Sequence, residues 1–249
     1  MKLWIKYLLF GLFSYLLFLM IRLPAGMAYG WLEGKMQPAA LSSLEGTLWS
    51  GRAAELHFRD AMLGEVEWSF SPSSLFNAGL GFSFILSGEQ IHAEGETGIT
   101  IDGAPYFSPL EGIVDARLLE RVLQFNLGRV KGDIEYQMES LDLSQEGHIS
   151  SAFGQFIWKE AAIAQPLGLE LGDVEFSVVT EESDIIIDFS GEGALTIDGR
   201  VIVEPDGRFT VNGLVLPQPS APEEVITALR SFGRETADGK IELEYTGRL

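Results

Sequence analysis

Residues 63–70 read LGEVEWSF, and residues 171–178 read LGDVEFSV. In both stretches an apolar residue alternates with a polar or charged one, as in Val66-Glu67-Trp68. A period of two turns one set of side chains toward a core and the other set toward solvent. The two stretches therefore predict β-strands with one buried face, and their likeness to each other suggests that the chain is built from a repeated unit.

Two further pairs of segments match in the same order along the chain. They are GETGITIDG at 95–103 with GEGALTIDG at 191–199, and LGRVKGDIEY at 127–136 with FGRETADGKIELEY at 232–245. Trp49 and Trp158 also correspond, because each precedes its Leu-Gly element by a similar distance. We therefore expect two antiparallel β units, residues 38–145 and 146–249, that form one domain and place Trp49 and Trp158 equivalently.

Turn and helix signals complete the expected mainly β fold. Four Asp-Gly dipeptides predict tight turns, since both residues tolerate positive φ: Asp102-Gly103, Asp198-Gly199, Asp206-Gly207 and Asp238-Gly239. A short helix is expected in each unit, one beginning after Asp115 and one after Ser220, where Glu223 completes a capping box. These helices would close an open end of the sheet or, alternatively, dock a partner.

The N-terminus carries an apolar segment, LWIKYLLFGLFSYLLFLMIRL at 3–23. Its uncharged part, residues 7–21, is short for a span of roughly 20 residues. Lys2 and Lys6 precede it, which favours a cytoplasmic N-terminus. We expect one transmembrane helix within an anchor at 1–25, followed by a juxtamembrane linker at 26–37. A signal peptide cleaved near Ala28 is the alternative, and both place the rest of the chain in the periplasm of a two-membrane bacterium.

Composition narrows the function. The formal net charge of −19 argues against nucleic acid as a partner, and it serves solubility or, alternatively, a basic partner or divalent cations. There is no Cys, which excludes disulfides and Cys-ligated zinc. His57, His92 and His148 lack the i, i+4 spacing of a helical metal site. With no nucleophile elbow or phosphate-binding loop either, the sequence predicts no enzyme, no metal and no cofactor.

One motif points to a family. Residues 44–53 read LEGTLWSGRA, and similar features are Val66-x-Trp68 before Ser71-Pro72, Gly154-x-Phe156-x-Trp158 and Asp238-Gly239-Lys240. Taken together, these stretches resemble the type II secretion system protein N family. The residues that carry the resemblance are Gly46, Trp49, Ser50, Gly51, Trp68, Pro72, Gly154, Trp158 and Gly239.

The resemblance implies a single-pass inner-membrane protein with a periplasmic β domain, held to the membrane by residues 3–23. Its implied partners are the inner-membrane platform and the clamp protein of the secretion system. It implies an accessory or assembly function without catalytic residues. The alternative is a periplasmic β-groove module that binds lipid or another apolar ligand, which would need an open apolar inner face. An exported hydrolase would need a cleft with convergent polar groups.

Overall fold

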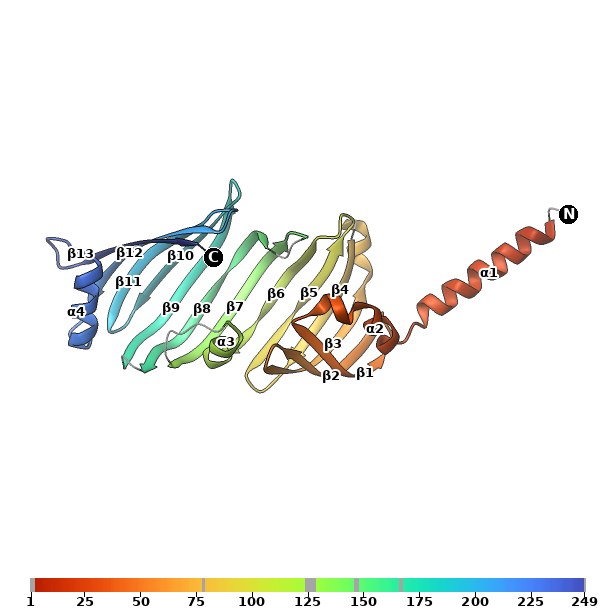
Figure 1. Cartoon of the computed structure of the whole chain (residues 1–249), viewed down its shortest axis with the longest axis horizontal. Helices are drawn as coiled ribbons and strands as arrows, with labels where there is room; N and C mark the ends of the chain where they lie inside the picture. Colours follow the sequence, from red (N-terminus) through yellow and green to blue (C-terminus); the bar gives the residue numbers. More distant parts are fainter. Residues whose placement is uncertain (1–2, 78, 124–128, 146–147, 166–167, 249) are drawn as a thin grey trace.

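The computed structural model describes residues 3–77, 79–123, 129–145, 148–165 and 168–248. Its elements follow one another in a simple order, with two helices before the first strand and two helices between later strands (Figure 1). They are α1 (Leu3–Ile21), α2 (Ala25–Met36), β1 (Ala39–Gly46), β2 (Ser50–Phe58), β3 (Ala61–Ser71), η1 (Pro72–Asn77), β4 (Gly79–Ser87), β5 (Ile91–Thr100), β6 (Pro105–Asp115), α3 (Ala116–Leu123), β7 (Arg129–Leu143), β8 (Ile149–Gln165), β9 (Leu169–Glu181), β10 (Asp184–Glu192), β11 (Leu195–Val203), β12 (Arg208–Pro217), α4 (Glu223–Phe232), β13 (Arg234–Glu235) and β14 (Ile241–Arg248).

All the strands belong to one open antiparallel sheet. From β1 to β12 each strand pairs with the next one along the chain, and the sheet then ends in the order β12-β14-β13. Figure 1 shows the sheet as a long twisted band, with α1 projecting from the end that carries β1. The predicted mainly β, antiparallel fold is confirmed, although the two expected units share one uninterrupted sheet.

The two faces of the sheet differ in polarity. The apolar face carries aromatic rings that touch across neighbouring strands: Phe156 and Phe176 stack at 4.4 Å between centroids, and Phe176 lies 6.2 Å from Phe189. Because successive side chains alternate, the residues between them, such as Glu175 and Asp188, point to the opposite, polar face. Rings on the apolar face also meet in the first half, at Phe70–Phe82 and Phe84–Phe107.

Helices α3 and α4 both pack on the apolar face. Buried Leu118 of α3 joins a cluster with Val114 and with the partly buried Tyr136. Buried Val225 of α4 joins Val174 and Val215 in the larger cluster. The two short helices predicted from the sequence are confirmed, and each removes part of the apolar face from water. The predicted capping box at Ser220 and Glu223 is wrong, because α4 begins after Pro222 and has no side-chain cap.

Similar local features recur in the two expected units, whose duplication stays a prediction. One helix follows the sixth strand and the other follows the twelfth. The Leu-Gly elements fall at the same point of β3 and β9, where Gly64 and Gly172 both have positive φ. A Cβ on Gly88 would meet the carbonyl oxygen of Leu63 at 1.8 Å, and a Cβ on Gly193 would meet that of Leu171 at 2.2 Å. The second expected unit begins at residue 146, and one matched segment begins at residues 127–128, which all lie outside the described residues.

The expected equivalence of Trp49 and Trp158 is wrong. Trp49 lies between β1 and β2, and its carbonyl accepts a hydrogen bond from the amide of Phe70. Trp158 lies inside β8 and pairs with Val174, closer to its Leu-Gly element. The two hairpins have matching register shifts, and Ala53, which pairs with Val66, is the counterpart of Trp158, which pairs with Val174. The chain between Ala161 and its partner Gly172 is longer than that between Leu56 and its partner Gly64, so equal spacing along the chain does not give equal positions across the ladder.

Three of the four predicted Asp-Gly turns are confirmed. The amides of Gly103, Gly207 and Gly239 each donate to the carbonyl three residues earlier. Asp198-Gly199 instead lies inside β11, which corrects the fourth prediction. The ring of Phe189 occupies the space beside Gly199, where a Cβ would approach its Cζ to 2.4 Å. That glycine therefore serves close packing and not a turn.

The N-terminal region differs from expectation in two ways. Within the described ranges, no helix combines the length and apolar character needed to cross a membrane, so the predicted transmembrane helix lacks this support. The segment predicted as a linker is helix α2, which begins after Pro24. Ala25 and Ala28 are buried, because α2 packs against β1.

We predict that Gly88→Ala and Gly193→Ala each lower the free energy of unfolding by about 2–3 kcal/mol, because the added methyl has no space against the facing backbone. Gly34→Ala in α2 is the matched control, since nothing lies within 4 Å of its Cβ position. Thermal unfolding followed by circular dichroism measures the difference. Equal stability of all three variants would contradict the assigned close approach.

Candidate functional site: an acidic groove beside an open sheet edge

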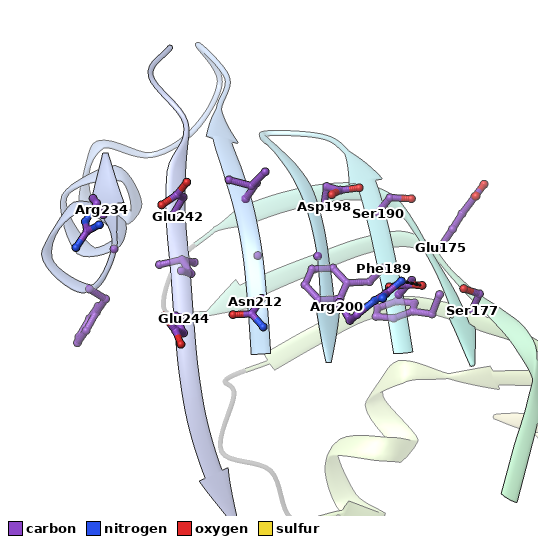
Figure 2. Close-up of a pocket in the computed structure, with 18 of the residues that line it drawn as sticks. Glu175, Ser177, Phe189, Ser190, Asp198, Arg200, Asn212, Arg234, Glu242 and Glu244 are labelled. Carbon is purple, nitrogen blue, oxygen red and sulfur yellow. Dashed lines mark hydrogen bonds and ion pairs between the residues drawn. The ribbon is translucent and has the colours of Figure 1, made fainter. Parts of the chain in front are cut away.

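A groove of about 1140 Å³ lies on the polar face over β8 to β14. Figure 2 shows that its labelled side chains come from adjacent strands, with Glu242 and Glu244 on β14 and Arg234 beyond them. The strand register explains the grouping, because Asp198 pairs with Ser190 on one side and with Leu214 on the other. The polar side chains that line it are Gln155, Glu175, Ser177, Asp188, Ser190, Asp198, Arg200, Asn212, Arg234, Glu242 and Glu244.

An ion pair lies in the middle of the groove. Arg200 donates from Nε and Nη2 to the two carboxylate oxygens of Asp188, at 2.5 and 2.9 Å. This hydrogen bonding lowers the pKa of Asp188 below its ordinary value of 3.8. The stabilisation from the pair is therefore present at neutral pH and is lost as the pH falls through the lowered pKa. Both side chains are about half exposed, so the contribution is small.

The rest of the groove is acidic. Five carboxylates and two guanidinium groups line it. Among the described residues, Glu175, Asp198, Glu242 and Glu244 form no ion pair. The groove therefore favours a basic ligand. Among the residues that the structure describes, no group of three His, Asp or Glu side chains is placed to hold a metal ion.

The groove ends at an open edge of the sheet. β14 pairs with β12 along its whole length. On the outer side, β13 covers only Ile241 and Glu242, which leaves Leu243 to Arg248 without a neighbouring strand among the described residues. Unpaired backbone groups on such an edge are available to a strand from another chain.

The opposite edge is protected. β1 pairs with β2 alone, but helix α2 packs against it. The amide of Leu41 donates to the hydroxyl of Tyr29 in α2 at 3.0 Å. Pro24 forms a bridge with Thr47, and the amide of Leu48 donates to the carbonyl of Leu23. The segment that follows α1 therefore blocks strand addition at this end.

Most of the family-motif residues gather at the corner between β1 and β2. Trp49 donates from Nε1 to the carbonyl of Met20 in α1 at 2.7 Å and packs edge-to-face on Phe70. Trp68 donates to the carbonyl of Leu48 and lies 2.7 Å from the Cβ position of Gly51. The motif thus links α1 to the sheet. It also borders a second, smaller groove of about 460 Å³, lined by Gly46, Ser50, Gly51 and Trp68 among others.

The remaining motif residues lie apart. Pro72 begins the single turn η1, Gly154 and Trp158 lie in β8, and Gly239 forms the turn before β14. None of them lines the acidic groove. The sequence did not identify the groove, because its members are ordinary polar residues that only the strand register brings together. The exposed, alternating acids of β14 were the one local signal.

These features define a class: a single-layer antiparallel β protein, tied at one end to an N-terminal helix and open at the other. The chain belongs to the type II secretion system (T2SS), protein N family, whose model matches residues 37–244. That range contains β1 to β13 and the first half of β14. The family assignment made from the Trp-Ser-Gly motif is therefore confirmed.

Curated relatives agree with this assignment. The chain is 26% identical over 252 residues to the type II secretion system protein N of Aeromonas hydrophila, covering 98% of this chain and 99% of that protein. It is 26% identical to the Klebsiella pneumoniae protein of the same name, covering 94% and 91% of the two chains. The Vibrio cholerae protein of that name is 24% identical, with 92% of each chain covered. No solved structure matches significantly.

We predict that Phe176→Ala lowers the free energy of unfolding by roughly 3–4 kcal/mol, since its ring packs between Phe156 and Phe189 on the apolar face. Asp188→Asn, on the polar face, is expected to change it by less than about 1 kcal/mol. Urea titration of both variants measures the contrast. Similar losses would show that the apolar face is not what holds the sheet together.

Proposed function

We propose that this chain is an accessory component that assists assembly of the type II secretion machine from the inner membrane. Its sheet would lie in the periplasm and contact the inner-membrane platform and the clamp protein. The observation that carries the proposal is the family match over residues 37–244, because it spans nearly the whole sheet and not one local motif.

Helix α1 supports the membrane part of the proposal. It is 19 residues long, and large apolar side chains along it are exposed, including Phe10, Phe13 and Phe18. An exposed apolar surface of this kind requires an apolar environment. Lys6 and Arg22 lie at its ends, where their long stems reach the lipid headgroups if the helix is slightly shorter than the bilayer. The basic residues at the start favour a cytoplasmic N-terminus.

The geometry also favours a function without chemistry. His57 lies in β2 beside Glu55, 3.2 Å away, and His92 pairs with Ser87 and Ile113 in β5. His148 lies just before β8, where its amide donates to the hydroxyl of Ser144. The three histidines therefore lie in separate parts of the sheet, and none lines the acidic groove.

Lipid binding is the second candidate function. The observation that favours it is the row of partly buried rings on the apolar face between α3 and α4, at Tyr136, Phe156 and Phe176. Against it, both helices pack on that face, and the large groove lies on the polar one. These arrangements favour the assembly function.

Affinity-tagged full-length protein, recovered from solubilised membranes of a secreting strain, tests the two functions together. We expect platform and clamp proteins to be recovered with it. Recovery of the protein alone with bound phospholipid would reject the assembly function and favour the lipid-binding one. A strain that lacks the platform is the control for non-specific recovery. Replacing Phe156 and Phe176 by Ala would not serve, because these rings also stabilise the sheet.

We predict that the N-terminal segment is retained and anchors the chain. N-terminal sequencing of the membrane-bound protein is expected to begin at the start of the sequence and not near Tyr29. Removal of residues 1–23 is expected to move most of the protein from the carbonate-washed membrane fraction to the soluble one. A mature chain that begins at Tyr29 would refute the anchor but would still be exported.

We predict that joint replacement of His57, His92 and His148 by Gln leaves secretion within about twofold of wild type. None of the three takes part in a constellation that could carry a reaction. Secreted substrate is measured in culture supernatants, with a strain lacking the protein as the reference for loss. A well-folded triple variant that abolishes secretion would contradict the non-catalytic function.

A further inference from the structure

The free edge of β14 offers backbone groups over six residues, Leu243 to Arg248. In an antiparallel strand, N–H and C=O groups point alternately to the two sides, so about half of these residues direct theirs away from β12. An extended segment from another protein can satisfy them, and its side chains would then alternate between the two faces of the sheet.

The chain itself shows which side chains suit the polar side of this edge. Arg234 of the short outer strand β13 lies opposite Glu242. Glu244 is the next residue of β14 on that face, and it lies past Arg234, the first residue of β13. It is exposed and has no ion pair among the described residues. The acidic groove continues inward from it through Asp198 and Glu175. An added strand that places a basic residue opposite Glu244, as Arg234 lies opposite Glu242, is therefore stabilised by a cross-strand charge pair.

The other side of the edge is apolar. Leu243 packs against the cluster under α4, while Tyr245 is 63% exposed. The Tyr245 ring lies beside that of Phe209 in β12, with 5.8 Å between centroids, and the rest of its surface is open to solvent. Apolar side chains on the same face of an added strand would bury more of this ring. Phe232, at the end of α4, is 85% exposed and belongs to the lining of the acidic groove.

From these observations we propose that β14 accepts a strand from a partner protein, an extended segment of about six residues in which basic and apolar side chains alternate. This inference rests on the proposed assembly function and names the surface that would serve it. The other end of the sheet is closed by α2, so the added strand extends the sheet only at β14.

A second copy of this chain fits the edge less well. Its own β14 would bring another Glu242 and Glu244 to a groove that already carries an excess of carboxylates. A basic partner reduces that excess, and like charges placed across neighbouring strands are unfavourable.

The test uses full-length protein in detergent and a fluorescein-labelled peptide, Lys-Val-Lys-Tyr-Arg-Val. A second peptide, Val-Tyr-Val-Lys-Lys-Arg, has the same composition and charge but no alternation. Fluorescence anisotropy measures both affinities. We expect the alternating peptide to bind at least tenfold more tightly than the scrambled one, and its affinity to fall as salt is added.

Two variants locate the binding. Glu244→Lys is expected to weaken binding of the alternating peptide at least tenfold. Glu135→Lys is the matched control, because Glu135 is also exposed on the polar face but lies in β7, and it is expected to change affinity less than twofold. Both variants are first shown to unfold at the wild-type temperature. Tyr245→Ala supplies an independent test of the apolar side and is also expected to weaken binding.

Equal binding of the two peptides would overturn the proposal, because it would show attraction to the acidic groove without strand pairing. Equal effects of Glu244→Lys and Glu135→Lys, or no binding at 1 mM peptide, would also overturn it. Sedimentation of the wild type as a dimer that Glu244→Lys disrupts would assign the edge to a second copy instead. Loss of peptide binding with intact recovery of the platform would reject this surface and leave the proposed function standing.

Discussion

The structure depends on one constraint, the uninterrupted backbone ladder that joins all the strands into a single sheet. A sheet with no second sheet packed on it has little core to share, so each hairpin must hold the next through its own hydrogen bonds and cross-strand contacts. Register is then essential, because a shift of one residue would turn Phe176 and Phe189 to the polar face and bring Glu175 and Asp188 to the apolar one.

That constraint explains where the glycines and the helices lie. Gly88 and Gly193 are needed where a strand end approaches the backbone of the neighbouring hairpin, and Gly199 makes room for the ring of Phe189. α3 and α4 cover parts of the apolar face that no second sheet covers. The polar face needs no cover, and its acids remain in solvent, where the twist of the sheet gathers them into a groove.

The sequence predicted the mainly β architecture because the alternation of apolar and polar residues and most of the Asp-Gly turns are local signals. It failed where the answer depended on register. Asp198-Gly199 has the composition of a turn, but the cross-strand ring of Phe189 makes it strand. Trp49 and Trp158 have similar spacing to their Leu-Gly elements, but the connection from β8 to β9 is longer than that from β2 to β3, so they lie at different positions of the ladder. The sequence did not predict the groove for the same reason, because its members are distant along the chain and meet only through the pairing of seven strands.

The two ends of the sheet are chemically unlike, and this asymmetry bears directly on function. At the β1 end, Trp49 donates a hydrogen bond to the carbonyl of Met20, and the amide of Leu41 donates one to the hydroxyl of Tyr29. The helical segment before β1 therefore satisfies a backbone group of the edge strand. At the last end, β13 stops after two residues and leaves β14 exposed beside unpaired acids. A sheet fixed at one end and extendable at the other can grow in only one direction, away from its N-terminal helix. The family motif lies at the closed end, where Trp49 links α1 to the sheet and Trp68 packs beside Gly51.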